Sequence, residues 1–314
     1  MTGKDATEVL PADAAGIARA ADLLRAGGLV AVPTETVYGL AARADSAAAV
    51  AAIYRAKGRP DFNPLIVHVA DLPAAGRLAL FDARARELAA RFWPGPLTLV
   101  LPLREGAPIA PAVTAGLPTI ALRMPAHPAM RALLAETDLP LAAPSANRSG
   151  GVSPTEPAHV VGSLAGRVGL VLDGGVCAQG LESTIVALRN DGSWQLLRPG
   201  PIEKARISAI LGEPHDVTSA KIEAPGQLAS HYAPGKPLRL DVSAPEPDEY
   251  MIGFGPVPGE ATLSQAGDLN EAAAHLYACL HRAAASPQPR IAVAPIPANG
   301  IGEAIRDRLM RAAA

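Results

Sequence analysis

The sequence has 314 residues, of which 49% are hydrophobic and 18% are charged, an ordinary composition for a globular protein. A net charge of −2 argues against a surface that binds polyanions throughout, and 4% aromatic residues are too few for an array of base-stacking side chains. Cys177 and Cys279 lie too far apart in sequence to clip a metal locally, so we expect buried free thiols. The N-terminal residues lack an apolar signal region and no apolar run has spanning length, so we expect a cytoplasmic protein without a membrane partner.

Helical and strand patterns alternate through the first two thirds of the chain. The predicted helices are Asp13–Ala26, Ala47–Ala56, Asp82–Arg91, Pro128–Glu136 and Ile202–Leu211. The predicted strands are Leu29–Val32, Leu65–Val69, Leu97–Leu101, Thr119–Arg123, Leu139–Ala143, Val168–Leu172, Ser183–Leu188 and Trp194–Leu197. This mixture predicts an α/β or α+β domain with a sizeable sheet. The stretch from Val168 to Arg198 has little helical pattern, so part of that sheet should be antiparallel.

Periodicity is lost between residues 212 and 237, where proline and glycine accumulate as they do in linkers. His231 and Tyr232 stand in this segment, although a passive spacer has little use for them. A smaller βαβ pattern then resumes with strands Leu238–Leu240, Tyr250–Phe254 and Ile291–Ala294 and helices Leu269–Ala285 and Glu303–Ala313. We therefore divide the chain into a first domain at 1–211, a linker at 212–237 and a small α/β domain at 238–314.

Polar residues gather at the predicted element ends between residues 33 and 69. Lys57 and Arg59 emerge where a helix stops, and His68 lies inside an apolar strand. Each has a plain structural explanation, because the helix dipole favours a C-terminal cation by about 0.3–1 kcal/mol and a lone strand histidine is more often a core residue. Their combination with Thr34 and Thr36, in loops fixed by proline and glycine, indicates an ordered binding site.

The sequence contains no Walker loop, dinucleotide fingerprint, HExxH, GxSxG or paired-cysteine zinc pattern. The segment PSANRSGG at residues 144–151 offers hydroxyls, an amide and free backbone N–H groups, which suit a phosphate or carboxylate. Together with the cations at 57, 59, 123 and 198, these groups suit a ligand with several phosphate oxygens and a small polar partner. Such a site would act by positioning and charge stabilisation rather than through a covalent nucleophile.

Several ordered motifs resemble the YrdC/Sua5 family: PTETVYGL, KGRPDFNPL, WPGPLT, TIALRMP, PSANRSGG followed by SPT, ESTI, and RPG. They cover the first domain nearly end to end, and HYAP in the linker with the extra domain points to the two-domain Sua5 type. The resemblance implies a YrdC-like open twisted mixed sheet and a small Rossmann-like C-terminal domain. It also implies an L-threonylcarbamoyladenylate synthase, a nucleotidyltransferase that makes threonylcarbamoyl-AMP and pyrophosphate from L-threonine, bicarbonate and ATP with Mg²⁺. The product would pass to the machinery that transfers the threonylcarbamoyl group to tRNA as t6A37.

The same resemblance implies the site residues. Lys57 and Arg59 would be the catalytic cations facing the reacting phosphate. The ATP-binding residues would be Lys57, Arg59, Asn63, Thr119, Ser145, Asn147, Ser153, Arg198, His231 and Tyr232. The L-threonine-binding residues would be Thr34, Thr36, His68, Arg123, Ala143 and Ser183. A guanidinium matches a carboxylate in bidentate fashion, so Arg123 would hold the threonine carboxylate. Whether His68 is a base or holds the threonine hydroxyl stays open.

The resemblance further implies that the linker folds over the site, with His231 and Tyr232 as a lid that excludes water. The linker reads PGQLASHYAP and lacks the basic residues that some relatives carry before HY. We expect a linker residue such as Tyr232 to contribute little to a core.

Three functions other than the synthase are considered: a nucleic-acid-binding module with weak RNA binding, a carbamoyl-transfer role as in hydrogenase maturation proteins, and a fold relative without synthase activity. The oligomeric state and the role of the C-terminal domain beyond anchoring the lid stay open.

Overall fold

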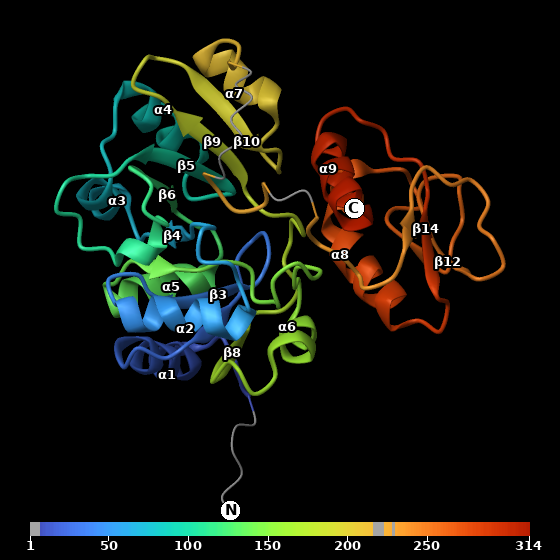
Figure 1. The fold of residues 1–314 in the computed structure, drawn as a ribbon, viewed down its shortest axis with the longest axis horizontal. Coiled ribbons are helices and arrows are strands. Elements are labelled where there is room, and N and C mark those ends of the chain that lie inside the picture. Colours follow the sequence, from blue (N-terminus) through green and yellow to red (C-terminus); the bar gives the residue numbers. More distant parts are fainter. Residues whose placement is uncertain (1–6, 216–222, 228–229) are drawn as a thin grey trace, which may run out of the picture.

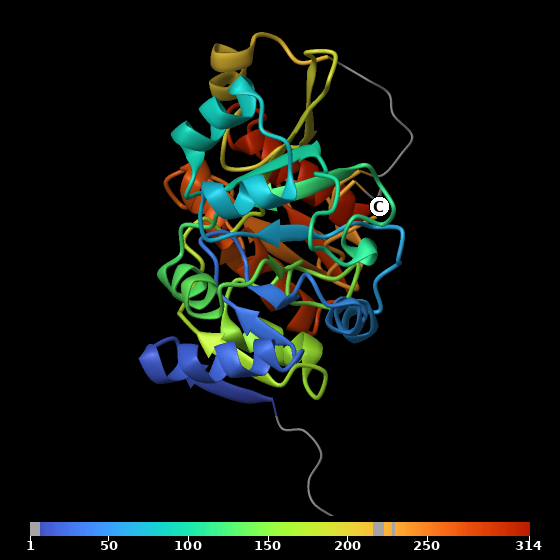
Figure 2. The same ribbon diagram turned by 90° about the vertical axis from the view of Figure 1, so that its left-hand side faces the viewer.

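The protein is described by a computed structural model that covers residues 7–215, 223–227 and 230–314. A large domain is built around one broad sheet, and a small domain stands beside it with its helices turned toward the large one (Figure 1). Seen from the large domain, the red helices of the small domain lie behind the strands (Figure 2). The division of the chain at residues 211 and 237 stays a prediction.

The large sheet has the order β1-β8-β2-β3-β7-β4-β6-β5-β9-β10. Its strands are β1 (Glu8–Pro11), β2 (Val30–Val32), β3 (Gly39–Arg43), β4 (Ile66–His68), β5 (Leu97–Pro102), β6 (Thr119–Arg123), β7 (Leu141–Ala142), β8 (Leu170–Asp173), β9 (Thr184–Leu188) and β10 (Trp194–Arg198). The pairs β4–β6 and β5–β9 are parallel, whereas β5–β6 and β9–β10 are antiparallel. The predicted mixed sheet with helices is therefore confirmed.

The helices of the large domain are α1 (Ala14–Arg25), α2 (Ala47–Lys57), α3 (Leu72–Leu78), α4 (Ala83–Phe92), α5 (Pro128–Thr137), α6 (Pro157–Leu164) and α7 (Lys204–Leu211), with a 3₁₀ turn at Pro111–Val113. Ser46 begins α2 by accepting a hydrogen bond from the backbone N–H of Ala49. Gly58 ends the helix in the left-handed conformation, with φ of 61°. This helix end is what brings Lys57 and Arg59 to adjacent positions.

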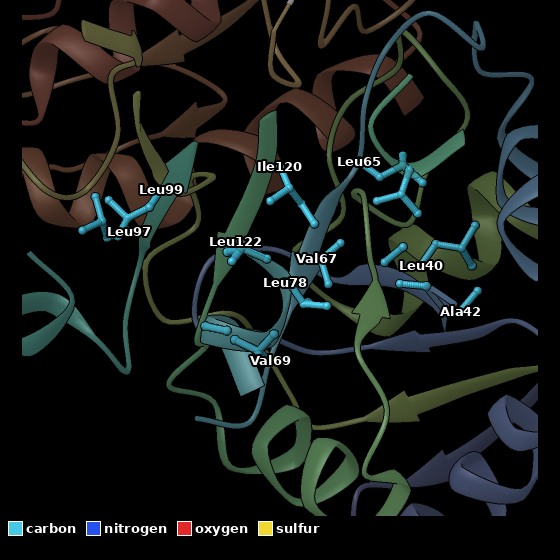
Figure 3. Packing of buried hydrophobic residues seen from close by; sticks show 14 of the residues in the cluster. Leu40, Ala42, Leu65, Val67, Val69, Leu78, Leu97, Leu99, Ile120 and Leu122 are labelled. Carbon is cyan, nitrogen blue, oxygen red and sulfur yellow. The ribbon is translucent and has the colours of Figure 1, made fainter. Parts of the chain in front are cut away.

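The two faces of the large sheet carry separate clusters of apolar side chains. Leu170 and Leu172 pack with α1 and α5, while Val171 between them packs in the cluster that contains α2 and α4. This alternation is the period of two expected for a strand buried on both faces. The cluster beneath α2 is drawn in Figure 3, where Leu40, Val67 and other strand residues point toward one another.

On the face of the sheet that packs against α1 and α5, the part around β4, β6 and β9 is covered by the linker instead of a helix. Ile66, Ala121 and Ile185 lie on this face, and Ala224 of the linker is fully buried against them. His68 and Arg123 follow Ile66 and Ala121 by two residues, so their side chains lie on the same face. The linker therefore roofs the part of the sheet that carries two of the predicted site residues.

The small domain contains a parallel sheet with the order β11-β14-β12-β13. Its elements are β11 (Leu238–Arg239), β12 (Glu249–Gly253), β13 (Ala261–Thr262), α8 (Leu269–Ala285), β14 (Arg290–Val293) and α9 (Gly302–Ala313). The expected small Rossmann-like domain is confirmed. Cys177 and Cys279 are buried free thiols, as expected.

Tyr232 corrects one expectation about the linker. Its side chain is only 1% exposed and belongs to the apolar cluster of the small domain. The aromatic ring lies 5.6 Å from that of Tyr277, centre to centre. The expectation that a linker residue contributes little to a core is wrong at this position, because the small domain folds around it.

Candidate active site

A cavity lies between the sheet and the linker, at the ends of β4 and β6. Most of the predicted site residues line it: Thr34, Thr36, Arg59, His68, Arg123, Ala143, Ser145, Ser183, Arg198, His231 and Tyr232. His68 and Arg123 are register partners at the carboxyl ends of two parallel strands, an edge where open α/β sheets place ligands. The linker closes the cavity from above with Pro225 and Gly226.

Gly226 is required for this closure. Its φ is 86°, in the left-handed region that favours glycine. A Cβ atom here would stand 2.9 Å from Cδ of Arg198 and 3.1 Å from the hydroxyl of Tyr232. The linker thus passes over both side chains at a separation that only glycine allows.

Arg123 and two threonines form one corner of the cavity. Arg123 donates hydrogen bonds to Thr36 Oγ1 at 2.9 Å and to Glu35 Oε1 at 2.6 Å. The hydroxyls of Thr34 and Thr36 lie 2.8 Å apart, and Thr34 also donates to the Val37 carbonyl. Burial alone would raise the pKa of Glu35, but the charge of Arg123 lowers it. The corner is therefore a preorganised ion pair with two hydroxyls facing the cavity.

His68 is buried beside this corner, and its Nδ1 has no hydrogen-bond partner within the described residues. Burial, and then the positive charge of Arg123, lower the pKa of His68 to about 3. The ring is therefore neutral near pH 7 and is a weak base. An unpartnered nitrogen of a buried ring beside a cavity is available to a ligand.

Three buried cations, Lys57, Arg59 and Arg198, have no carboxylate within ion-pair distance among the residues that the structure describes. Burial lowers the pKa of Lys57 well below its usual range, lowers that of Arg59 to about 10 and also lowers that of Arg198. Buried charges without a counter-ion are costly, so this group is suited to an anion that enters from solvent.

Lys57 lies beneath the loop of residues 145–147 and does not line the cavity. Its ammonium group donates to the carbonyls of Ser145 and Asn147, both at 2.5 Å. Ser145 itself faces the cavity. The Lys57 charge therefore acts from behind the loop, whereas Arg59 lines the cavity directly and donates to the carbonyls of Asn63 and Pro64.

Arg198 holds the opposite wall. It donates to the carbonyl and the hydroxyl of Ser183, each at 3.0 Å, and to the Pro225 carbonyl of the linker at 3.4 Å. The Ser183 hydroxyl also pairs with that of Thr98 at 2.7 Å. Arg198 thus joins the start of β9 to the linker.

Four other predicted residues do not line the cavity. Thr119 is at the far end of β6 from Arg123, about 13 Å along the strand. Asn63 is buried with its side-chain oxygen unpartnered, and Asn147 donates to the carbonyls of Arg148 and Gly151. Ser153 donates its hydroxyl to Glu182 at 2.6 Å.

His231 and Tyr232 enter the cavity from the linker. Their rings lie 4.1 Å apart, centre to centre, in an edge arrangement. Burial lowers the pKa of His231 to about 3, and its Nδ1 is without a partner in the described part of the chain. Tyr232 has a φ of 65°, a costly backbone conformation for a non-glycine residue, so the surrounding contacts fix it in place.

Sequence reasoning missed two acidic residues of this region, Glu35 and Glu182. Both stand inside quoted motifs, PTETVYGL and ESTI, so the signal was present.

The residues that the structure describes contain no group of three or more histidine, cysteine or acidic side chains that could hold a metal. No helix in the described part of the chain is long and apolar enough to cross a membrane.

The fold and cavity define an α/β protein with a cation-rich binding site beneath a linker. A family model described as "telomere recombination", for Sua5, YciO and YrdC, matches residues 22–200. A second model, described as the threonylcarbamoyl-AMP synthase C-terminal domain, matches residues 202–314. The chain belongs to this Sua5/YciO/YrdC family, in its two-domain form.

Known relatives agree with this assignment along the whole chain. The threonylcarbamoyl-AMP synthase of Bacillus subtilis is 42% identical over 98% of this chain and 96% of its own length. That of Pyrococcus abyssi is 46% identical over 68% of this chain and 64% of its own length. The crystal structure of P. abyssi Sua5 with L-threonine matches with a TM-score of 0.88 and 35% identity, over 98% of both chains.

Proposed function

We propose that this protein is a threonylcarbamoyl-AMP synthase that makes the adenylate and pyrophosphate from L-threonine, bicarbonate and ATP. The observation that carries the proposal is the group of three buried cations without a carboxylate partner. Arg59 and Arg198 line one cavity with the arginine–threonine corner, and Lys57 lies behind its loop. Curated members of the family bear this name. The cations suit a polyphosphate, and the corner suits a small amino acid.

The triphosphate would occupy the wall made by Arg59, Arg198 and the loop at Ser145. Charge grows on the phosphate oxygens as pyrophosphate leaves, and fixed cations stabilise that charge without reorganising. Lys57 enters the proposal as a cation behind the loop, which holds the loop carbonyls and adds positive potential. Asn63, Asn147, Ser153 and Thr119 remain proposed for the nucleotide side, with Thr119 the most distant from the cavity.

L-Threonine would occupy the corner at Arg123, with its carboxylate on the guanidinium N–H groups that Glu35, Thr36 and the Gly95 carbonyl leave free. Thr34, Thr36 and Ala143 line the same cavity, as does Ser183, the residue before β9. We propose a binding role for His68, because a ring with a pKa of about 3 is poorly matched to removing a proton from an ammonium group.

The reaction would proceed through a carbamate. The threonine amine adds to the carbon of bicarbonate or carbon dioxide, and a carbamate oxygen then attacks the α-phosphorus while the bond to pyrophosphate breaks. Water is the other product when bicarbonate is used. Pro225, Gly226, His231 and Tyr232 would exclude solvent while these unstable species exist.

Magnesium enters as part of the substrate Mg-ATP. Within the residues described, the carboxylates nearest the site, Glu35 and Glu182, are occupied by Arg123 and Arg308. The side chains near the site therefore do not fit a dedicated magnesium site, and phosphate oxygens and water suit the ion better.

We also propose that the protein is cytoplasmic and that its product passes to the tRNA t6A machinery.

Pyrophosphate release by the purified protein tests the proposal. We expect release with Mg-ATP that requires both L-threonine and bicarbonate, with L-serine as a matched amino acid that supports it less well. Folded protein that binds ATP but releases no pyrophosphate in response to threonine would contradict the function. Salt-dependent RNA binding without ATP would then favour a nucleic-acid-binding module.

A further inference from the structure

Glu182 lies at the contact between the two domains and also lines the cavity. Its carboxylate accepts three hydrogen bonds. One comes from Ser153 of the large domain at 2.6 Å, and two come from the small domain, from Tyr277 at 2.8 Å and Arg308 at 2.9 Å. Glu182 is thus a cavity residue whose charge partner belongs to the other domain.

This group is buried, and Arg308 has a second carboxylate partner in Asp307 of its own domain, at 2.6 Å. Arg308 is 0% exposed, and it also donates to the Pro199 carbonyl of the large domain. Burial alone would raise the pKa of Glu182, but the charges of Arg308 and Arg198 lower it to about 2. A buried carboxylate that loses its partner is strongly destabilised, so Glu182 depends on Arg308 to remain an anion in this place.

The same two residues of the small domain also fix the lid tyrosine. The guanidinium of Arg308 lies 5.4 Å from the ring centre of Tyr232, and the Tyr277 ring lies 5.6 Å from it. Arg308 and Tyr277 therefore contact the wall of the cavity through Glu182 and its cover through Tyr232.

Apolar contacts reach the site from the same direction. Val37, Val152 and Leu181 of the large domain are buried in the apolar cluster of the small domain. Each is the neighbour in sequence of a site residue, namely Thr36, Ser153 and Glu182. A Cβ atom at Gly180 would lie 2.5 Å from the Ala273 carbonyl of α8, so the segment that leads to Glu182 is pressed against that helix.

We infer that Arg308, assisted by Tyr277, is a positioning residue of the synthase site, supplied by the small domain through Glu182 and Tyr232. Glu182 precedes Ser183, whose carbonyl and hydroxyl hold Arg198. Holding Glu182 in place therefore also holds Ser183 and, through it, the Arg198 side chain. The site is incomplete without the small domain. This inference rests on the proposed function for its kinetic test.

The test compares full-length variants by steady-state pyrophosphate release. Arg308→Met should lower kcat by about 100-fold or more, because it leaves the Glu182 carboxylate buried without its partner. The double variant Glu182→Gln/Arg308→Met should recover at least about tenfold, because the uncompensated charge is gone. A residue that only supports packing would give no such rescue.

Arg306→Met is the matched control on the same helix, because Arg306 pairs with Asp241 at 3.0 Å inside the small domain. Its kcat should stay within about twofold of wild type, as for an exposed ion pair. Hydrogen exchange of residues 180–185 gives a readout without catalysis. We expect faster exchange in Arg308→Met and near wild-type exchange in the double variant.

Wild-type kinetics and exchange in Arg308→Met would overturn the inference, as would a double variant no better than the single one. Absence of threonine-dependent release from the wild-type protein would instead refute the proposed function. In that case the exchange comparison still decides whether Arg308 orders the segment at Glu182.

Discussion

Among single residues, Arg59 gives the clearest test of a polyphosphate site. Its pKa is lowered to about 10 by burial, which means that its charge costs stability in the protein without ligand. Arg59→Met should leave the melting temperature without ATP unchanged or higher and should weaken ATP binding by about 10–100-fold, the effect of one charge-assisted hydrogen bond.

Calorimetric titration with Mg-ATP, beside thermal unfolding with and without nucleotide, measures both effects. Arg55→Met is the matched control, since Arg55 lies in the last turn of α2, four residues before Arg59, and is exposed. A variant at position 59 that binds ATP as wild type does would remove Arg59 from the phosphate site.

His68 offers a second test, which separates binding from proton transfer. With a pKa of about 3 the ring is a poor base, so His68→Gln should raise the KM for L-threonine by about tenfold with a small change in kcat. Steady-state kinetics with threonine varied at saturating ATP measures both. A loss of about 10²–10⁴ in kcat with unchanged KM would instead identify a general base.

Two buried histidines, His68 and His231, and two half-buried ones, His159 and His281, make stability depend on pH. Burial lowers the pKa of His68 and His231 to about 3 and those of His159 and His281 to about 4. The unfolded chain binds protons below about pH 6.5 while the folded chain does not, so stability falls as pH falls. Each histidine should cost about 2 kcal/mol at pH 5 relative to pH 8. Thermal unfolding between pH 8 and pH 5 checks this; a rising melting temperature toward pH 5 is the contrary result.

At the scale of elements, the linker takes the place that a helix would occupy over β4, β6, β5 and β9. It is tied to the strand pair β9–β10 by two hydrogen bonds from Arg189 to Glu223, at 2.6 and 3.0 Å. Ala224, the next residue, is fully buried. The cover of the site is therefore held at one end by an ion pair and at the other by the small domain.

Glu223→Ala should loosen this cover. We expect the free energy of unfolding to change by no more than about 1 kcal/mol, as for partly exposed ion pairs, and the KM for ATP to rise several-fold. Chemical denaturation and pyrophosphate kinetics measure the two quantities. Arg91→Met, which removes an exposed pair with Glu87, is the control. An unchanged KM would show that the ion pair does not hold the cover.

The sequence predicted an element most accurately where capping residues marked its ends and the element was long. Helix α8 was predicted at its observed bounds, and Ser46 and Gly58 mark the ends of α2 as expected. Five short elements, β1, β3, β13, α3 and α6, were missed, as was the 3₁₀ turn Pro111–Val113. Strand β3 reads GLAAR, without a β-branched or aromatic residue, and α3 has only seven residues with a proline and a glycine. Tertiary pairing decides such segments.

At the scale of the whole molecule, the motifs predicted which side chains gather but not what each one contacts. Arg123 meets Glu35 across 88 positions and Arg308 meets Glu182 across 126, and spacing in sequence carries no information about such pairs. The same limit hid the position of Lys57 beneath its loop and the burial of Tyr232. Both depend on how distant segments close on one another.

Formation of the adenylate itself is the most direct measurement. The protein is incubated with Mg-ATP, L-threonine and ¹³C-bicarbonate, and the products are analysed by mass spectrometry. We expect threonylcarbamoyl-AMP that is heavier by the mass of the label, in an amount equal to the pyrophosphate released. Pyrophosphate without a labelled adenylate, or an adenylate that lacks the bicarbonate carbon, would contradict a threonylcarbamoyl-AMP synthase.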